Sequence, residues 1–340
     1  MPETVSAEPI LEPELPIVDP HHHLWDRPGV RGAELPPPRH PFEVLTRLSP
    51  RYLLDELLAD VRRGHNVRAT VFVQCGAMYR ADGPAHLRPV GETEFVVGAT
   101  AGAPIAAGIV GWADLMQGAA VGRTLDGHLE AGGGRFRGVR FNVVWHHLHS
   151  STAHAGRATV PHMLLDPGYR AGLREVARRD LTYDVWLYHP QLPELADAVD
   201  AAPAELTFVV DHLGGPVPDK ATSAARAAVF DDWRRDLAEV AKRPNVVLKI
   251  GGVGMPVYGF AFEGRPSSAE LAEAWRPYVE VAIDAFGADR CMFESNFPVD
   301  KQGFSYDALW NAFKLLTQGW SADERTSLFS GTARRVYRLP

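Results

Sequence analysis

The sequence predicts a (β/α)8 barrel from three observations: eight apolar runs, helix-like stretches between them, and long segments after several runs. The runs are short, rich in β-branched residues and mostly continuous, which is typical of parallel strands covered on both faces. They span residues 15–19, 69–74, 105–111, 136–142, 182–188, 206–210, 246–250 and 291–293. A doubly wound sheet is the second choice, but no Gly-x-Gly-x-x-Gly turn follows the first run.

Helix-like stretches with recognisable ends separate these runs. Ser49-Pro50 predicts an N-cap followed by proline at the first helical position, before a leucine-rich stripe that Gly64 ends. Asp166-Pro167 repeats this start signal before residues 169–179. Further helices are expected over residues 92–101, 118–131, 192–201, 224–242, 268–286 and 305–317, and residues 322–337 are expected to close the bottom or side of the barrel.

Long connecting segments follow three of the expected strands, over residues 24–50, 143–166 and 251–267. The carboxyl ends of the strands meet at one face of such a barrel, and that face carries the active site. We therefore expect these segments to form lids or pocket walls over a catalytic face.

Composition restricts the class of partner. The chain has 340 residues, of which 46% are hydrophobic, and its net charge of −7 argues against nucleic acid or an anionic membrane surface. Cys75 and Cys291 lie in apolar runs, so we expect core residues rather than a disulfide framework. Residues 1–14 are expected to be a disordered tail before a single domain of residues 15–340. We expect a cytoplasmic protein without a membrane span, and a homo-oligomer is left open.

Polar side chains gather where the expected strands end. The four strand-end histidines are His21, His23, His189 and His212, and they come from three strands. On a strand, side chains alternate, so His21 and His23 are expected on one face and His22 on the other. A buried polar group without a partner costs free energy, so several imidazoles gathered at one end of the barrel are expected to have a ligand or protein partners. A metal or substrate site explains them.

The same residues carry a resemblance to a known family. The motifs are Asp19-x-His21-x-His23, Phe72-Val73-Gln74, Arg137-Gly138-Val139-Arg140, His189-Pro190, Asp211-His212-Leu213-Gly214, Phe293-x-Ser295-x-Phe297-Pro298 and the ending Leu328-Phe329-x-Gly331-Thr332-Ala333. Over almost its whole length the chain resembles the amidohydrolase superfamily, and more closely its amidohydrolase-related branch. That branch contains sugar lactonases, a pyrone-dicarboxylate lactonase and nonoxidative decarboxylases.

The resemblance implies a metal site. It makes His21, His23, His189 and His212 candidate ligands of one divalent cation, zinc first and manganese second. A bound metal would acidify water and polarise a carbonyl group. Two-metal members use a lysine from the fourth strand, and residues 136–142 contain none, so one metal is the upper limit. A metal-free site stays open, since the pyrone lactonase type is thought to work without a metal.

The eighth strand departs from the branch. Where the branch usually reads Gly-Ser-Asp, this chain reads Glu294-Ser295-Asn296, so an amide stands at the position of the catalytic carboxylate. An amide cannot act as a base. Glu294 is our first candidate for the missing carboxylate, because it faces the same side as Asn296 from one layer deeper. Asp300 is the second, if the turn after Pro298 folds it back over the site.

Other residues are candidates for binding substrate. Arg140 is expected either to hold a substrate carboxylate or to form an ion pair with Glu294 or Asp211. Lys249 interrupts an apolar strand and is expected to face either a substrate anion or a structural carboxylate. Candidate substrate-contacting rings are Trp25, Trp145 and Tyr188 near strand ends and His146 in the loop after the fourth strand. The alternative is packing in the core for the aromatic rings and exposure to solvent for His146.

Two carboxylates receive a structural interpretation. Asp211 neighbours His212, so alternation puts it on the opposite face, where it is expected to orient a loop. Glu92 opens a helix, where the helix dipole favours a carboxylate.

The leading hypothesis is a metal-dependent hydrolase that opens a lactone or similar cyclic ester. The expected substrate is small and cyclic, and a carboxylate on it is left open. The choice of a lactone comes from the resemblance. The alternative is a nonoxidative decarboxylase or other C–C lyase that uses the same histidines, since no water need then lose a proton. The third option is a metal-free lactonase-like enzyme or a binding protein without catalytic activity.

Overall fold

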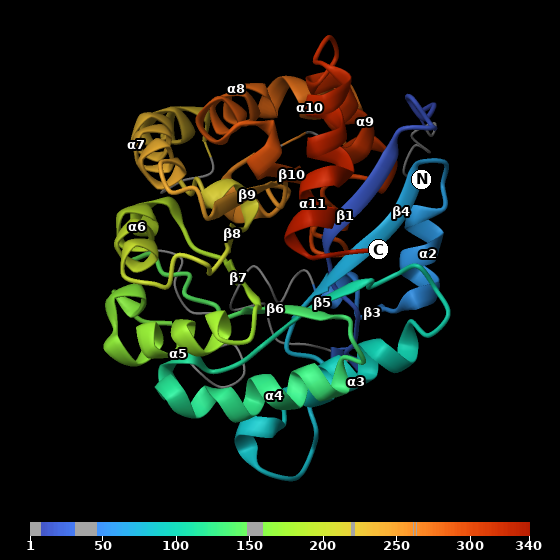
Figure 1. The fold of residues 1–340 in the computed structure, drawn as a ribbon. Coiled ribbons are helices and arrows are strands. Elements are labelled where there is room, and N and C mark those ends of the chain that lie inside the picture. Colours follow the sequence, from blue (N-terminus) through green and yellow to red (C-terminus); the bar gives the residue numbers. More distant parts are fainter. Residues whose placement is uncertain (1–7, 31–45, 148–158, 219–221, 261, 263) are drawn as a thin grey trace.

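The computed structural model describes residues 8–30, 46–147, 159–218, 222–260, 262 and 264–340. Eight parallel strands form one sheet in the order β1-β4-β5-β6-β7-β8-β9-β10, which confirms the expected (β/α)8 barrel (Figure 1). Their bounds are β1 Pro16–His22, β4 Asn66–Val73, β5 Gly108–Gly111, β6 Phe136–Arg140, β7 Thr182–Val185, β8 Phe208–Val210, β9 Val246–Ile250 and β10 Cys291–Phe293. Hydrogen bonds between the ends of β1 and β10 nearly close the barrel, because Asn296 N–H donates to His21 O (2.9 Å) and His23 N–H to Phe297 O (2.8 Å).

Helices surround the strands on the outside. They are α2 Leu54–Val61, α3 Val90–Ala99, α4 Gly122–Ala131, α5 Pro167–Ala177, α6 Leu192–Asp200, α7 Ser223–Ala241, α8 Ser268–Phe286, α9 Tyr306–Leu316, α10 Ala322–Thr326 and α11 Thr332–Val336. The side chain of Asp166 caps α5 as expected, accepting from the backbone N–H groups of Gly168 and Tyr169.

The predicted helix start at Ser49-Pro50 is wrong. Arg51–Tyr52 form a short strand, β3, which pairs antiparallel with β2, Trp25–Asp26. The helix begins only at Leu54, where the Glu56 carboxylate accepts the Leu53 N–H at 2.8 Å. Pairing with β2 therefore takes precedence over the local start signal, and it ties both ends of the segment between β1 and α2 together.

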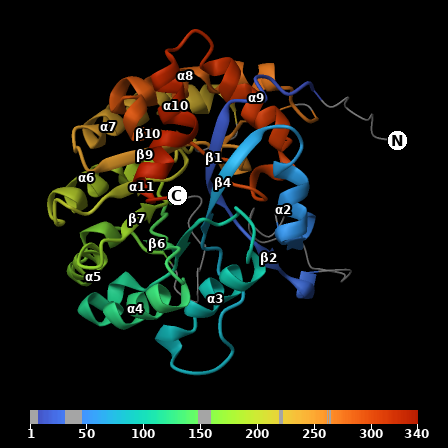
Figure 2. The same ribbon diagram turned by 45° about the vertical axis from the view of Figure 1, so that its right-hand side comes forward.

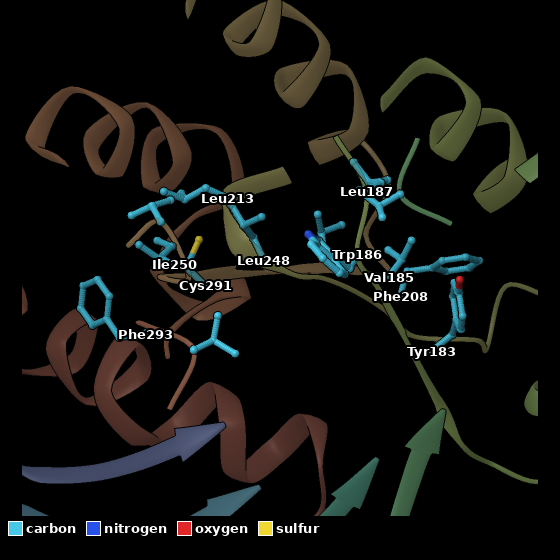
Figure 3. Packing of buried hydrophobic residues seen from close by; sticks show 14 of the residues in the cluster. Tyr183, Val185, Trp186, Leu187, Phe208, Leu213, Leu248, Ile250, Cys291 and Phe293 are labelled. Carbon is cyan, nitrogen blue, oxygen red and sulfur yellow. The ribbon is translucent and has the colours of Figure 1, made fainter. Parts of the chain in front are cut away.

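Two apolar layers alternate along the strands. Val18, Val71, Val110, Val209, Val247 and Met292 pack in one cluster with Ala333, Val336 and Tyr337 of the C-terminal segment. The C-terminal segment therefore closes the bottom of the barrel, and Figure 2 shows α11 beside the strands. The alternate residues, among them Tyr183, Val185, Phe208 and Ile250, belong to the larger cluster that also contains the helix side chains (Figure 3). Cys75 and Cys291 are buried and free, as expected.

Residues 8–14 differ from the expected disordered tail. Leu11 N–H donates to Asn311 Oδ1 and Asn311 Nδ2 to Pro9 O, both at 2.9 Å. Lys314 Nζ donates to Leu11 O at 2.6 Å. Hydrogen bonds to α9 therefore order this segment; residues 1–7 lie outside the described part of the chain. Among the described helices, none combines the length and apolar character that a membrane span requires.

The contact between Tyr337 and the barrel interior can be tested. Its hydroxyl donates to Asp184 Oδ2 at 2.5 Å inside the barrel. Tyr337→Phe is expected to lower the free energy of unfolding by about 1–3 kcal/mol, because the buried carboxylate loses a donor. Urea denaturation measures this. Tyr79→Phe is the control, since that buried hydroxyl has no hydrogen-bond partner in the described structure; equal losses in both variants would contradict the prediction.

Candidate active site

The strand ends bring the first two candidate histidines together. His21 and His23 are buried with ring centroids 5.0 Å apart, and the His21 ring lies 4.7 Å from that of His212. His22 points elsewhere and contacts Thr70 Oγ1 through Nε2 at 2.8 Å. Burial lowers the pKa of His22 to about 3, so this imidazole is neutral.

His21 is enclosed by charged groups. Its Nε2 lies 3.2 Å from a guanidinium nitrogen of Arg140 and its Nδ1 lies 3.3 Å from Lys249 Nζ, and both of these neighbours can only donate. That Nδ1 lies 2.6 Å from Glu294 Oε2 and 3.6 Å from Asp211 Oδ1. Both ring nitrogens of His21 are thus committed to protein groups.

Glu294 also holds His212. One carboxylate oxygen accepts both the backbone N–H of His212 (3.1 Å) and its Nδ1–H (2.6 Å). Burial alone would raise the pKa of Glu294, but the imidazoles of His212 and His21 outweigh it and hold the pKa below its usual value. A carboxylate with a lowered pKa is a weak base, so the geometry favours an orienting role over the base that we expected first.

The local backbone is shaped around this pair. His212 has a φ of +55°, a conformation that non-glycine residues rarely adopt. A Cβ atom at Gly252 would lie 1.9 Å from His212 Nδ1, and one at Gly251 would lie 2.6 Å from Glu294 Cγ. The two glycines after β9 therefore leave the space that the Glu294–His212 contact occupies.

Asp211 corrects one expectation. It lies in the barrel interior with Lys249 Nζ 3.1 Å from its Oδ1 and Arg140 3.4 Å from its Oδ2, and it does not orient a loop on the opposite face. Lys249 also donates to Asp184 at 2.7 Å. Burial alone would lower the pKa of Lys249, but the carboxylates of Asp184 and Asp211 outweigh it and raise the pKa.

These contacts decide between the alternatives for the two cations. Lys249 and Arg140 both pair with carboxylates of the protein, and Arg140 also donates to Gln74 O at 2.5 Å. The structural interpretation of each residue is the one that the geometry supports.

His23, Asn296 and Asp300 form a second group. His23 Nδ1 donates to Val73 O at 2.7 Å, which leaves the lone pair on Nε2, 3.3 Å from Asn296 Oδ1. The amide orientation is set by Asn296 Nδ2, which donates to Asp300 Oδ1 at 3.1 Å. The turn after Pro298 thus folds Asp300 back. The other oxygen of Asp300 accepts the Gly254 N–H at 3.1 Å, and burial raises the pKa of Asp300 to about 7 although His212 opposes this.

The remaining candidates are less closely tied to this centre. Val217 N–H donates to His189 Nδ1 at 3.3 Å, which puts the ring proton on Nε2 and leaves no lone pair there for a metal. Trp25 stacks on His23, with centroids 6.1 Å apart and planes at 24°. Tyr188 and His146 are buried, and their rings meet edge to face with centroids 6.2 Å apart. The backbone N–H of Trp145 donates to Gln191 Oε1.

Glu92 lies in the first turn of α3, as expected, and also makes long-range contacts that the sequence did not predict. Glu92 is 1% exposed, and its Oε1 accepts the N–H groups of Cys75 (3.0 Å) and Ala77 (2.8 Å) just after β4. It fixes the turn at the mouth of the barrel rather than serving the helix dipole alone. Its position at a helix start gave no signal of this long-range contact.

The buried imidazole–carboxylate centre lies at the strand ends, where (β/α)8 enzymes have their active sites. The family model described as amidohydrolase matches residues 18–339, and the chain belongs to this family. It is 34% identical over 331 residues to the uncharacterized protein y4mH of Sinorhizobium fredii, covering 96% of this chain and 99% of that protein. It is 29% identical over 332 residues to the L-fucono-1,5-lactonase of Burkholderia multivorans, covering 95% and 96%. These relationships support a hydrolase.

A solved structure supports the same assignment. The crystal structure of an amidohydrolase from Burkholderia multivorans with bound zinc matches with a TM-score of 0.71 and 25% identity, covering 95% of this chain and 99% of that one.

Two groups of residues are candidates for holding a metal. Among the described residues, donor atoms of His21, Asp211 and His212 all lie within 4.8 Å of one another. The ammonium of Lys249, 3.1 Å from Asp211 and 3.3 Å from His21 Nδ1, already supplies positive charge there. This group therefore fits an additional cation poorly.

The group at His23 fits better. His23 Nε2 and Asn296 Oδ1 are both acceptors and face each other at 3.3 Å, an arrangement that a cation between them would stabilise. His23 and Asn296, with the Asp300 carboxyl group beside them, are therefore the residues that would hold a divalent ion.

The metal assignment predicts different effects for neighbouring histidines. His23→Ala is expected to weaken zinc binding at least about tenfold, because it removes a ligand atom. His22→Ala is the matched control, since His22 contacts Thr70 on the other side of the strand. Competition with a chromophoric chelator measures affinity on untagged protein. Equal affinities in the two variants, or loss of zinc only in Asp211→Asn, would contradict the assignment.

Proposed function

We propose that this protein is a metal-dependent lactonase that opens the cyclic ester of a hydroxy acid by adding water. The observation that carries the proposal is the facing pair of acceptors, His23 Nε2 and Asn296 Oδ1, next to the buried carboxyl group of Asp300. The 29% identity with an L-fucono-1,5-lactonase over nearly the full length supports a sugar lactone as the substrate class.

The reaction has a simple balance. The oxygen of water forms a bond to the lactone carbonyl carbon, the ring C–O bond breaks, and the water proton ends on the departing alkoxide. A bound zinc or manganese ion would supply positive charge that polarises the carbonyl group and acidifies water. The residues of the chain would bind and orient the substrate and transfer the proton.

Asp300 is the proposed proton acceptor. Each of its oxygens receives one hydrogen bond, from Asn296 Nδ2 and from Gly254 N–H, and each keeps a further lone pair. Those two donors fix the carboxylate beside the Asn296 amide. Asn296 itself orients the group, because an amide cannot take the proton.

Glu294 has a positioning role in this proposal. By holding His212 through Nδ1, it directs the other nitrogen, Nε2, away from the carboxylate. The neighbouring His21 is fixed between Glu294 and Arg140. These contacts hold both imidazoles in a fixed orientation at the strand ends.

The lactonase assignment predicts ring opening and proton release. The wild-type protein with zinc is expected to release one proton for each aldono-1,5-lactone consumed, because the product acid is ionised at neutral pH. A pH indicator in weak buffer measures this, with boiled protein as the control for spontaneous hydrolysis. Carbon dioxide release from hydroxybenzoates without lactone hydrolysis would favour the lyase alternative instead.

The role of Asp300 predicts a large loss of turnover. Asp300→Asn is expected to lower kcat about 100- to 10,000-fold, because the proton acceptor is lost while the hydrogen-bonding shape is largely kept. Asp307→Asn is the control: it removes another buried carboxylate, which pairs with Arg63 at 2.7 Å. Steady-state kinetics on the same lactone measures both, and a kcat for Asp300→Asn within threefold of the wild type would rule out Asp300 as the base.

A further inference from the structure

The two buried cations of the barrel are committed to the protein. Arg140 contacts Asp211, His21 and the carbonyl of Gln74, and Lys249 contacts Asp184 and Asp211. Within the described structure, Arg140 keeps only its Nε without a hydrogen-bond partner, and the charge of each cation is already paired with a protein carboxylate. A cation whose charge is not paired in this way is the better candidate for binding a substrate carboxylate.

Arg27 has the required properties. It follows β2 at the carboxyl end of the barrel, is partly buried, and forms no ion pair with any carboxylate in the described structure. One guanidinium nitrogen donates to Cys75 O at 3.1 Å, and its Nε has no hydrogen-bond partner there. A guanidinium has five N–H donors, so this side chain keeps donors for a ligand.

The surroundings of Arg27 link it to the proposed centre. Its guanidinium lies 5.4 Å from the centroid of Trp25, and Trp25 in turn stacks on His23. Cys75, which holds Arg27, directly follows Gln74, whose carbonyl holds Arg140. Arg27 is thus fixed at the same strand end as the buried centre, by an aromatic face and a backbone carbonyl.

We infer that Arg27 is a specificity residue that binds a carboxylate substituent of the substrate, so that the preferred lactones are derived from dicarboxylic sugar acids. This inference rests on the proposed lactonase function and adds the substrate class. A planar guanidinium matches a carboxylate through two parallel hydrogen bonds. With a net charge of −7, the protein as a whole repels anions, so a local cation at the mouth serves such a substrate.

The test compares two lactones that differ only at C6. Arg27→Met is expected to lower kcat/KM for D-glucaro-1,4-lactone about 10- to 100-fold, mainly through KM, because a charge-assisted hydrogen-bonded pair is lost. For D-glucono-1,4-lactone, which lacks the carboxylate, the change is expected to stay within threefold. Arg27→Lys should recover part of the preference, since it keeps the charge without the fork.

Arg51→Met is the matched control. Arg51 lies on β3, the partner strand of β2, and pairs with Asp55 at 2.9 Å. A purely structural role of Arg27, as a link between the β1 segment and the end of β4, would lower kcat/KM for both lactones equally. Equal losses, or no loss, would overturn the inference.

A second measurement separates this inference from the proposed reaction. If the wild type opens neither lactone, calorimetry with glucarate and gluconate tests the carboxylate site directly. The inference then requires that the wild type binds glucarate more tightly and that Arg27→Met loses this difference. A wild type without preference between the two acids would overturn it, whatever the reaction catalysed.

Discussion

The ammonium of Lys249 is the interaction on which the interior of this barrel depends. It lies 2.7 Å from Asp184 and 3.1 Å from Asp211, and all three side chains are fully buried. Without that charge, Asp211 would depend on Arg140, 3.4 Å away, and Asp184 would depend on neutral donors such as the Tyr337 hydroxyl. Asp184 connects downward to Tyr337, which closes the bottom of the barrel, and Asp211 lies upward beside His21. One buried cation therefore links the closure of the fold to the orientation of the candidate active site.

The eight strands and their order follow from the sequence because continuous apolar runs report burial on two faces. His21 and His23 were assigned to one face and His22 to the other correctly, because side chains alternate along a strand. Asp211 was not, since alternation holds only within a strand. Strand β8 ends at Val210, and the positive φ of His212 then turns the chain so that Asp211 and His212 both reach the interior. The irregular backbone at His212 depends on contacts with Glu294 and Gly252, which are far away in the sequence. A local sequence pattern contains no information about such contacts.

The partners of the charged residues could not be predicted for a related reason. The sequence identified Arg140 and Lys249 as strand-end cations but left a substrate anion and a protein carboxylate as alternatives for each. The carboxylates that decide the matter come from β7 and β8, far along the chain. Glu92 is a similar case, because its contacts with Cys75 and Ala77 depend on how α3 packs over the end of β4.

The two departures at the eighth strand are best understood together. Where the related branch has Gly-Ser-Asp, this chain has gained a carboxylate at Glu294 and lost one at Asn296. The gained carboxylate hydrogen-bonds to Nδ1 of His212 and lies 2.6 Å from Nδ1 of His21, so it occupies the space beside both nitrogens. The Asn296 amide presents its oxygen to His23 and donates an N–H to Asp300. A carboxylate four residues further along the chain is thereby held at the strand end. The partners of Asn296, and not its identity alone, therefore determine which acceptor atoms and which carboxylate this strand end presents.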